Sequence, residues 1–226
     1  MRNYLVVIPA YNESGHIRAV VSAVRRHLPV IVVDDGSTDD TARRAAAAGA
    51  GVLRQPANQG KGAALRAGFR EALALGFEAV LTLDGDGQHD PAEIPHFLEA
   101  DARRPADLII GRRRFDQMPW VRRLANTLGC GLFTWALGQY VPDNQSGYRL
   151  ISRRLMEAVL DDPERGFEFE VDMITVCLKS RYTLAWVPIR TIYAGEASHI
   201  QPLHHALNFL RVVLATRQKM HGHLLG

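Results

Sequence analysis

Short apolar runs alternate with amphipathic stretches through the first half of this chain, and this alternation constrains its fold most strongly. The apolar runs are at residues 4–8, 30–33, 52–53, 79–83 and 108–110. Helical patterns stand between them, at about residues 14–27, 38–48 and 61–75 and after Pro91. Near-continuous apolar strands joined by helices are typical of a parallel sheet covered on both faces. The pattern therefore predicts an α/β fold with a Rossmann-like, mostly parallel sheet and helices on both faces.

The second half of the chain has a less regular pattern. It predicts helices at about residues 121–137, 153–160, 168–180 and 202–221, and strands at 148–151 and 184–189. We find no internal repeat and no linker, so a single domain over residues 1–226 is the simplest division.

Composition and charge restrict the class of protein. The chain has 226 residues, of which 47% are hydrophobic and 23% charged, as in a folded globular protein. The net charge is only +3, too weak a bias to indicate nucleic-acid binding. Arginines gather at 112–114, 122–123 and 153–154, where they form either solvated surface or, facing one cleft, an anion site. Cys130 and Cys177 have apolar neighbours, and we expect two buried, reduced thiols. No signal-peptide pattern opens the chain, so we expect a cytoplasmic protein.

Two segments raise the question of membrane contact. Residues 124–142 carry no charge, but polar side chains shorten the apolar part, which favours a buried or interfacial helix over a spanning one. The helix expected at 202–221 has a leucine stripe at Leu203, Leu207, Leu210 and Leu214. These leucines either pack on the domain or attach the protein to a membrane.

Acidic residues follow the fourth apolar run. Asp84 and Asp86 are separated by the small Gly85, and Gln88 adds a neutral oxygen on the same side of an extended stretch. Two adjacent carboxylates repel unless a cation compensates them, and Mg²⁺ or Mn²⁺ prefers such oxygens and is commonly shared with substrate phosphates. The alternative is an acidic turn before a helix, with Asp90 as its N-cap. That alternative explains Asp90 but neither Asp84 nor Asp86.

A second acidic pair, Asp34 and Asp35, follows the second apolar run. These residues either cap the next helix or accept hydrogen bonds from a ribose or base. Residues 58–62 resemble a phosphate loop but lack the Walker A spacing, and no GxGxxG, HExxH or GxSxG motif is present. Ligands of parallel sheets bind at the carboxyl ends of the strands. The acidic strand ends therefore indicate a metal-bound nucleoside diphosphate and the transfer of a group attached to it.

Three motifs, one at the end of each of the first, second and fourth apolar runs, resemble family-2 inverting glycosyltransferases of the GT-A fold. They are VIPAYNE at 7–13, VVDDGSTD at 32–39 and LDGDGQH at 83–89. DNQSGYR at 143–149, FEFE at 167–170, VPIR at 187–190 and SHI at 198–200 resemble one branch, the dolichol- or polyprenyl-phosphate mannose and glucose synthases. The Gln-x-x-Arg-Trp signature of the processive branch is absent. The resemblance divides the domain into a nucleotide-sugar half (1–112), an acceptor half (113–200) and a C-terminal amphipathic helix (201–226).

The resemblance also implies roles for individual residues. Nucleotide-sugar contacts would come from Pro9, Tyr11, Glu13, Val33, Asp35, Lys61, Asp84 and Gly85. Mg²⁺ or Mn²⁺ would bind Asp84, Asp86 and Gln88. The acceptor would meet Arg113, Arg122, Asn126, Arg149, Ser198 and His199, with Asp86, Arg113 and Arg122 as catalytic residues. The family commonly has Ser-Lys where this chain has Ser198-His199, and some members carry an arginine near Tyr193 that is absent here.

The implied reaction moves a hexose from GDP-mannose or a UDP-sugar to a polyprenyl phosphate. An ionised phosphate is already a nucleophile, so the site needs positive groups rather than a strong base. Such an acceptor implies peripheral attachment at the cytoplasmic membrane face, directly or through a membrane-protein partner. Three alternatives stay open: a soluble hydroxyl acceptor with Asp143 as base, a sugar-1-phosphate nucleotidyltransferase, and a non-enzymatic nucleotide-sugar binding protein.

Overall fold

The computed structural model describes residues 2–113, 120–161, 169–190 and 202–221. Its strands are β1 (Tyr4–Ala10), β2 (Val30–Asp34), β3 (Gly51–Arg54), β4 (Ala79–Thr82), β5 (Leu108–Arg113), β6 (Arg149–Ser152) and β7 (Leu184–Ile189). Its helices are α1 (Ile17–Val24), α2 (Thr41–Ala47), α3 (Lys61–Ala74), η1 (Pro91–Glu93), α4 (Ile94–Arg103), α5 (Trp120–Leu137), α6 (Arg153–Asp161), α7 (Phe169–Lys179) and α8 (Pro202–His221).

The strands form one sheet in the order β3-β2-β1-β4-β6-β5-β7. All neighbouring pairs are parallel except those of β6, which is antiparallel to both β4 and β5. The predicted mostly parallel α/β sheet is therefore confirmed. The reversal of β6 has one consequence for function. Its amino end, and not its carboxyl end, lies at the edge where β1, β2 and β4 finish.

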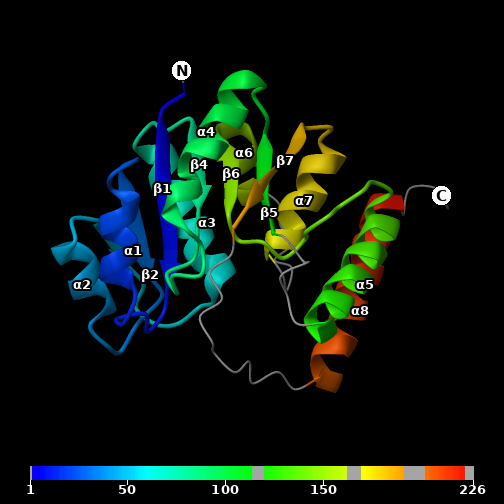
Figure 1. Cartoon of the computed structure of the whole chain (residues 1–226), viewed down its shortest axis with the longest axis horizontal. Coiled ribbons are helices and arrows are strands. Elements are labelled where there is room, and N and C mark those ends of the chain that lie inside the picture. Colours follow the sequence, from blue (N-terminus) through cyan, green and yellow to red (C-terminus); the bar gives the residue numbers. More distant parts are fainter. Residues whose placement is uncertain (1, 114–119, 162–168, 191–201, 222–226) are drawn as a thin grey trace.

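Helices cover both faces of the sheet, as predicted (Figure 1). The alternate side chains of β1 separate the two layers, because successive residues of a strand point to opposite faces. Leu5 and Val7 pack with α3, α6 and α7, whereas Val6 and Ile8 pack with α1, α2 and α4. Apolar side chains of β1 are thus buried on both faces of the sheet, which explains the near-continuous hydrophobic strands in the sequence.

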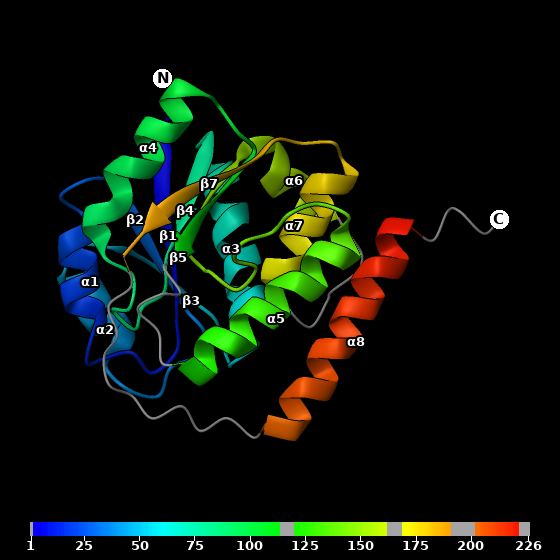
Figure 2. The same ribbon diagram turned by 45° about the vertical axis from the view of Figure 1, so that its right-hand side comes forward.

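Helices α5 and α8 stand apart from these layers and lie side by side at one end of the molecule (Figures 1 and 2). A small cluster joins them to α7, in which Phe133 and Ala136 of α5 meet Val213 of α8 and Val171. None of the described helices is long and apolar enough to cross a membrane. The interfacial or buried interpretation of residues 124–142 agrees with this result. Of the two free cysteines, Cys177 is buried as expected, but Cys130 is only half-buried.

Candidate functional site

The loops after β1 and β2 are joined into one wall at the carboxyl edge of the sheet. The amide of Asn12 donates to Ser37 Oγ at 2.9 Å, and the Thr38 amide donates back to Asn12 Oδ1 at 2.9 Å. The Glu13 amide donates to Thr41 Oγ1 at 2.8 Å. Asn12 has a φ of 56°, a left-handed conformation that asparagine tolerates better than most residues. The exposed Tyr11 stands on this wall, so its ring is available to a ligand.

Asp34 and Asp35 are buried and hold neighbouring loops. Asp35 accepts the amides of Gln59 and Gly60, each at 2.8 Å, and so ties down the loop that precedes α3. Asp34 accepts the Ser37 amide at 3.1 Å. The helix-capping interpretation of this pair is wrong, because the residue before α2 is Asp40, where no side-chain cap forms. The two carboxylates instead hold the loop after β2 and the loop before α3 at one edge.

Gly36 makes this junction possible. Its φ is +73°, and a Cβ at this position would lie 2.5 Å from the carbonyl carbon of Ala57. Only glycine allows the two loops to approach so closely.

The segment with the three predicted metal ligands, residues 84–88, forms a turn rather than the expected extended stretch. Gly85 and Asp86 lie at the corner of this turn, and Gly87 has a φ of +78°. The turn is closed by the Gln88 amide, which donates to Asp86 Oδ1 at 2.9 Å. Beyond it, the Asp90 side chain accepts from the Ala92 amide with Pro91 following, so the predicted cap is confirmed. In an extended stretch, alternate side chains point to the same side, and on that basis we placed Asp84, Asp86 and Gln88 together. The turn removes this basis for the prediction.

The buried side chain of His89 packs against the backbone of Asp84. The Asp84 amide donates to His89 Nδ1 at 3.1 Å, so that nitrogen carries no proton. Burial lowers the pKa of His89 and outweighs the opposing charge of Asp84. The ring centroid also lies 5.2 Å from that of Tyr148. His89 is therefore a neutral support for the Asp84 backbone.

A lysine bridges two carboxylates at the centre of this edge. Lys61 Nζ lies 2.6 Å from Asp84 Oδ1 and 2.8 Å from Glu170 Oε1. Burial opposes the charge of each group, but the ion pairs outweigh it: the pKa of Lys61 is raised, and those of Asp84 and Glu170 are lowered. All three groups are charged at neutral pH. The Lys61 side chain is nevertheless 40% exposed, so a ligand can reach it.

Glu170 was missed as a site residue by sequence reasoning. The FEFE motif pointed to this segment, but nothing in it showed that the second glutamate would meet Lys61. Backbone packing completes the cluster, since a Cβ on Gly147 would lie 2.9 Å from both Asp84 Oδ2 and Lys61 Nζ. The loop that leads into β6 therefore passes directly against the ion pairs.

Arg113, at the end of β5, forms a two-point ion pair with Asp143 in the loop before β6. Arg113 Nε donates to Asp143 Oδ2 at 2.8 Å and Nη2 donates to Oδ1 at 2.9 Å. Asp143 also accepts the amides of Arg113, Gln145 and Ser146, each at 3.2 Å. Asp143 is 1% exposed and Arg113 is 20% exposed. Arg113 thus presents part of its guanidinium at the edge, while Asp143 is fully occupied with holding it.

Arg149 does not fit its expected role as an acceptor contact. It is completely buried, and its guanidinium donates to the backbone carbonyls of Ser146 at 2.7 Å, Asn144 at 3.0 Å and Glu170. Burial lowers the pKa of Arg149 to about 10, which still leaves it charged at neutral pH. We therefore assign Arg149 to holding the 143–148 loop and the start of α7 together.

The other predicted site residues differ in burial, and some lie outside the described residues. Pro9 and Val33 are buried in the sheet, so their side chains do not face a ligand, and Gly85 is buried beside Glu13. Asn126 is half-buried on α5. Ser198, His199 and the side chain of Arg122 lie outside the described residues.

The oxygen atoms of Asp84 and Asp86 are of the type that binds a hard divalent cation. No group of three or more His, Cys, Asp or Glu side chains in the described parts of the chain is arranged to hold a metal ion. Two carboxylates at Asp84 and Asp86 nevertheless match the preference of Mg²⁺ for one or two protein carboxylates together with substrate phosphates. The Lys61 ammonium against Asp84 shows that a positive charge is stabilised at this position.

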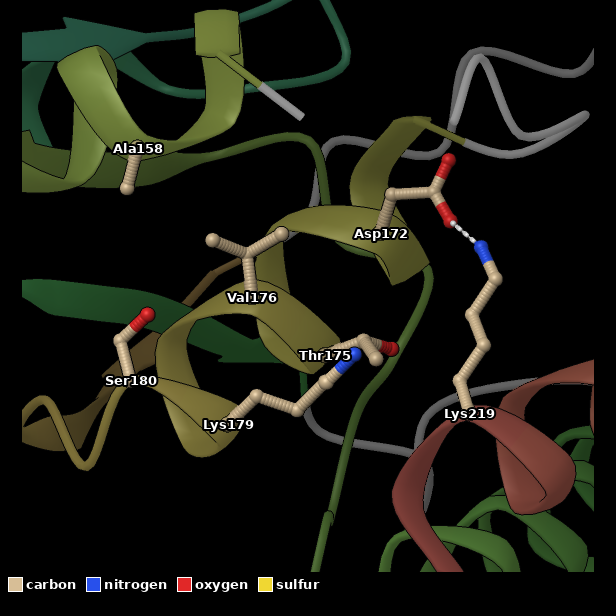
Figure 3. A pocket seen from close by; sticks show the side chains of 7 residues that line it. All are labelled: Ala158, Asp172, Thr175, Val176, Lys179, Ser180 and Lys219. Carbon is tan, nitrogen blue, oxygen red and sulfur yellow. Dashed lines mark ion pairs between the residues drawn. The ribbon is translucent and has the colours of Figure 1, made fainter. Parts of the chain in front are cut away.

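A separate pocket of about 200 Å³ lies away from this edge (Figure 3). It is lined by residues of α6, α7 and α8, and the Lys219–Asp172 ion pair, at 3.5 Å, crosses it (Figure 3). We assign it no part in the site at the carboxyl edge.

Comparison with known proteins identifies the family. The model of "Glycosyl transferase family 2" matches residues 5–160. The chain belongs to this family. It is accordingly a glycosyltransferase with the GT-A fold, and family membership sets aside the nucleotidyltransferase and non-enzymatic alternatives.

Similar proteins include several that are named for lipid-phosphate acceptors. An undecaprenyl-phosphate mannosyltransferase of Micrococcus luteus is 34% identical, over 82% of this chain and 82% of its own. A polyprenol monophosphomannose synthase of Mycolicibacterium smegmatis is 31% identical, over 82% of this chain and 76% of its own. A UDP-N-acetylglucosamine–dolichyl-phosphate N-acetylglucosaminyltransferase of Methanococcus voltae is 30% identical, over 83% and 85%.

Among solved structures, glucosyl-3-phosphoglycerate synthase of Mycobacterium tuberculosis has the same fold. Its complex with Mn²⁺, UDP and glucosyl-3-phosphoglycerate is 27% identical with a TM-score of 0.70, covering 98% of this chain and 80% of that one. The relatives and this neighbour thus carry names with different acceptors.

Proposed function

We propose that this chain is a metal-dependent inverting glycosyltransferase that moves a hexose from a nucleoside-diphosphate sugar to a polyprenyl-phosphate lipid. The observation that carries the proposal is the state of Asp143. This acid, the candidate base for a hydroxyl acceptor, is 1% exposed and held by Arg113 and backbone amides. A phosphate acceptor is ionised at neutral pH and needs no base, so it suits this edge better.

On the donor side, Asp84 and Asp86 would hold Mg²⁺ or Mn²⁺, with Gln88 near them. The ion supplies positive charge to the leaving diphosphate. Lys61 adds a second positive group, positioned by Glu170. Crystals of the structural neighbour with Mn²⁺ and UDP support this assignment.

The wall after β1 and β2 would receive the nucleoside. Its exposed Tyr11 offers a ring to the base, and the Glu13 segment and the Asp35-anchored loop bound the space on either side. Because Asp35 already accepts two amides, it acts mainly by holding residues 59 and 60 in place.

On the acceptor side, Arg113 would bind the acceptor phosphate, with Arg122 and Asn126 of α5 beside it. The Asp143 carboxylate occupies Nε and Nη2 of Arg113 and fixes the plane of the guanidinium. A guanidinium held in one plane suits a phosphate. The acceptor oxygen then attacks the anomeric carbon opposite the leaving diphosphate, which inverts the configuration.

This assignment keeps the division into a donor half (1–112), an acceptor half (113–200) and a C-terminal helix (201–226). Ser198 and His199 are retained as residues that would close over the donor. The acceptor places the enzyme peripherally at the cytoplasmic membrane face, directly or with a membrane-protein partner.

A soluble acceptor is the second candidate, because the structural neighbour was crystallised with phosphoglyceric acid. The two candidates are separated by a transfer assay. Purified protein with Mn²⁺ is given UDP-glucose, UDP-N-acetylglucosamine or GDP-mannose, with either undecaprenyl phosphate in detergent or 3-phosphoglycerate. We expect a glycolipid product from one donor, and none when EDTA replaces Mn²⁺.

Product on 3-phosphoglycerate alone would replace the lipid proposal by the soluble one. Asp86→Asn tests the metal role against Asp161→Asn, an exposed acid at the end of α6. Equal activity of both variants would contradict the assignment of Asp86.

A further inference from the structure

We infer that α5 and α8 together form a docking surface for a bilayer with anionic headgroups. The inference rests on the proposed function, because a lipid acceptor lies in a bilayer and gives the enzyme a reason to bind one. The surface, named here the α5–α8 face, consists of Leu128, Leu132 and Trp135 with Leu210 and Leu214, flanked by arginines.

The apolar side chains of α5 form one stripe. Leu128, Leu132 and Trp135 are spaced by four and three residues, which places them on one side of a helix. All three are exposed, and Leu128 is the most exposed at 61%. Phe133 and Ala136 point the other way and are fully buried. The helix therefore has a second apolar side that the described fold leaves uncovered.

Helix α8 shows the same arrangement. Its Phe209 ring packs edge-on against Phe133, with centroids 5.3 Å apart, and Val213 is buried in the same cluster. Leu210 and Leu214 are consequently turned outward, and Leu214 is 60% exposed. The alternative that these two leucines pack on the domain is wrong.

One contact shows that the two stripes belong to one surface. The Arg217 guanidinium lies 3.9 Å from the centroid of the Trp135 ring, and its Nη1 donates to the Trp135 carbonyl at 3.0 Å. Arg217 is three residues beyond Leu214, on the same side of α8. Trp135 is three residues beyond Leu132 on α5. The stripes therefore meet along the side-by-side helices seen in Figures 1 and 2.

The orientation of α8 is held from its other side. Lys219 Nζ lies 3.5 Å from Asp172 Oδ1 of α7. Figure 3 marks this ion pair with a dashed line. Rotating α8 to bury Leu210 and Leu214 would break this ion pair and expose Phe209 and Val213. The outward leucines are thus a property of the packed structure.

Charge selects the occupant. Helices α5 and α8 contain four arginines, Arg122, Arg123, Arg211 and Arg217, besides Lys219 on the other side of α8, and neither helix contains an Asp or Glu. A second copy of this chain would bring like charges together, which opposes dimerisation through this face. Apolar residues flanked by arginines are instead the pattern of helices that lie in the interface of an anionic membrane.

The test is vesicle flotation of the full chain. Vesicles of phosphatidylcholine alone are compared with vesicles in which about a third of the lipid is phosphatidylglycerol. We expect at least about tenfold tighter binding to the anionic vesicles, because each arginine near the surface contributes roughly fivefold. Equal binding to both, or no binding to either, would overturn the inference.

A matched pair of variants places the binding on the face. Leu128→Glu/Leu214→Glu should reduce anionic-vesicle binding by about tenfold or more. The control Leu75→Glu/Arg103→Gln makes the same change in net charge at exposed positions, directly after α3 and at the end of α4. Leu75 is 56% exposed, and the control should stay within about twofold of the parent chain. Circular dichroism confirms that each variant is folded. Equal losses in both variants would overturn the inference, as would a wild-type dimer in solution that Leu128→Glu/Leu214→Glu dissociates.

Two readouts separate this inference from the proposed function. Vesicle binding needs no donor, so it stands even when transfer to polyprenyl phosphate is absent. Conversely, Leu128→Glu/Leu214→Glu should keep transfer to a short-chain polyprenyl phosphate in detergent. Quenching of Trp fluorescence by lipids brominated on their acyl chains should fall in Trp135→Phe. Unchanged quenching in that variant would count against insertion of the face.

Discussion

Acidic side chains at the two edges of the sheet differ in how fully other protein groups occupy them. At the carboxyl edge Asp35 and Asp143 are buried and occupied, but Asp84 and Asp86 are partly exposed. At the amino edge, Asp101 accepts from Arg2 and from the Tyr4 hydroxyl, each at 2.8 Å. Asp107 accepts from Arg154, Ser152 and Thr183. At the carboxyl edge, the lysine that pairs with Asp84 is 40% exposed, and within the described structure Asp86 takes a single backbone amide, from Gln88.

This difference separates stability from function. A buried carboxylate that is saturated by protein donors contributes to folding and has little left for a ligand. Acids that keep lone pairs directed at solvent or at a displaceable lysine can bind a cation and an anionic substrate. The variants below are chosen to test whether the edges really divide the work in this way.

The largest expected effect is on activity, from Asp86→Ala. Removal of one of the two carboxylates proposed to hold the metal should lower kcat/KM by at least about 10²-fold in the assay with Mn²⁺. The melting temperature should change little, because few protein contacts are lost. A large fall in melting temperature with activity retained would reverse the assignment of this edge.

Next is Lys61→Gln, which leaves the Asp84 and Glu170 carboxylates without their shared ammonium. We expect donor affinity in the presence of Mn²⁺ to fall by about tenfold or more, because the variant loses a positive group beside the position proposed for the diphosphate. Isothermal titration with the nucleoside diphosphate measures this loss. Lys179→Gln, an exposed lysine on α7, serves as the control and should bind like the parent chain.

Asp107→Asn should have the opposite signature from Asp86→Ala. We expect a loss of about 2 kcal/mol in the free energy of unfolding, seen as a fall of roughly 4–8 °C in melting temperature. The kcat should be unchanged, because Asp107 lies at the amino edge. A variant of normal stability with low kcat would break the comparison.

The effect of Asp107 also depends on pH. Burial alone would raise its pKa, but hydrogen bonds from Arg154, Thr183 and Ser152 hold the pKa below its usual range. Its contribution to stability is therefore complete above the unfolded pKa of about 4 and is lost as the pH falls through the folded value. Denaturant unfolding of the parent chain and of Asp107→Asn should converge as the pH drops below about 4.

The smallest effect is expected from Gly147→Ala. The new methyl group would meet Asp84 Oδ2 and Lys61 Nζ at 2.9 Å, and both are ends of side chains that can move. We expect a change in kcat/KM of a few-fold to about tenfold, with melting temperature nearly unchanged. Gly131→Ala on α5, where a Cβ meets nothing within 4 Å, is the control.

The sequence alone determined much of the sheet and of its carboxyl edge. Apolar runs and amphipathic stretches predicted the sheet and its helices, because burial on both faces imposes those patterns locally. The sequence also located Asp84 and Asp86, since strand ends in a parallel sheet share one edge. The loop-holding role of Asp35 depended on the distant amides of Gln59 and Gly60, which no local pattern contains. The turn from Gly85 to Gly87 is closed locally, by the Gln88 amide on Asp86, but the expected extended stretch did not predict it.

Tertiary structure decided the rest. Antiparallel β6 begins at the carboxyl edge, and this reversal brings Asp143, Gly147 and Arg149 against the ion pairs. The tertiary structure also determined that Arg149 is buried. It brought Glu170 to Lys61, although these two residues are separated by more than a hundred positions in the sequence. The sequence showed a leucine stripe in the last helix. Only the packing of Phe209 and Val213 against α5 decided that Leu210 and Leu214 face outward, because a helix with apolar residues on two sides can bury either one.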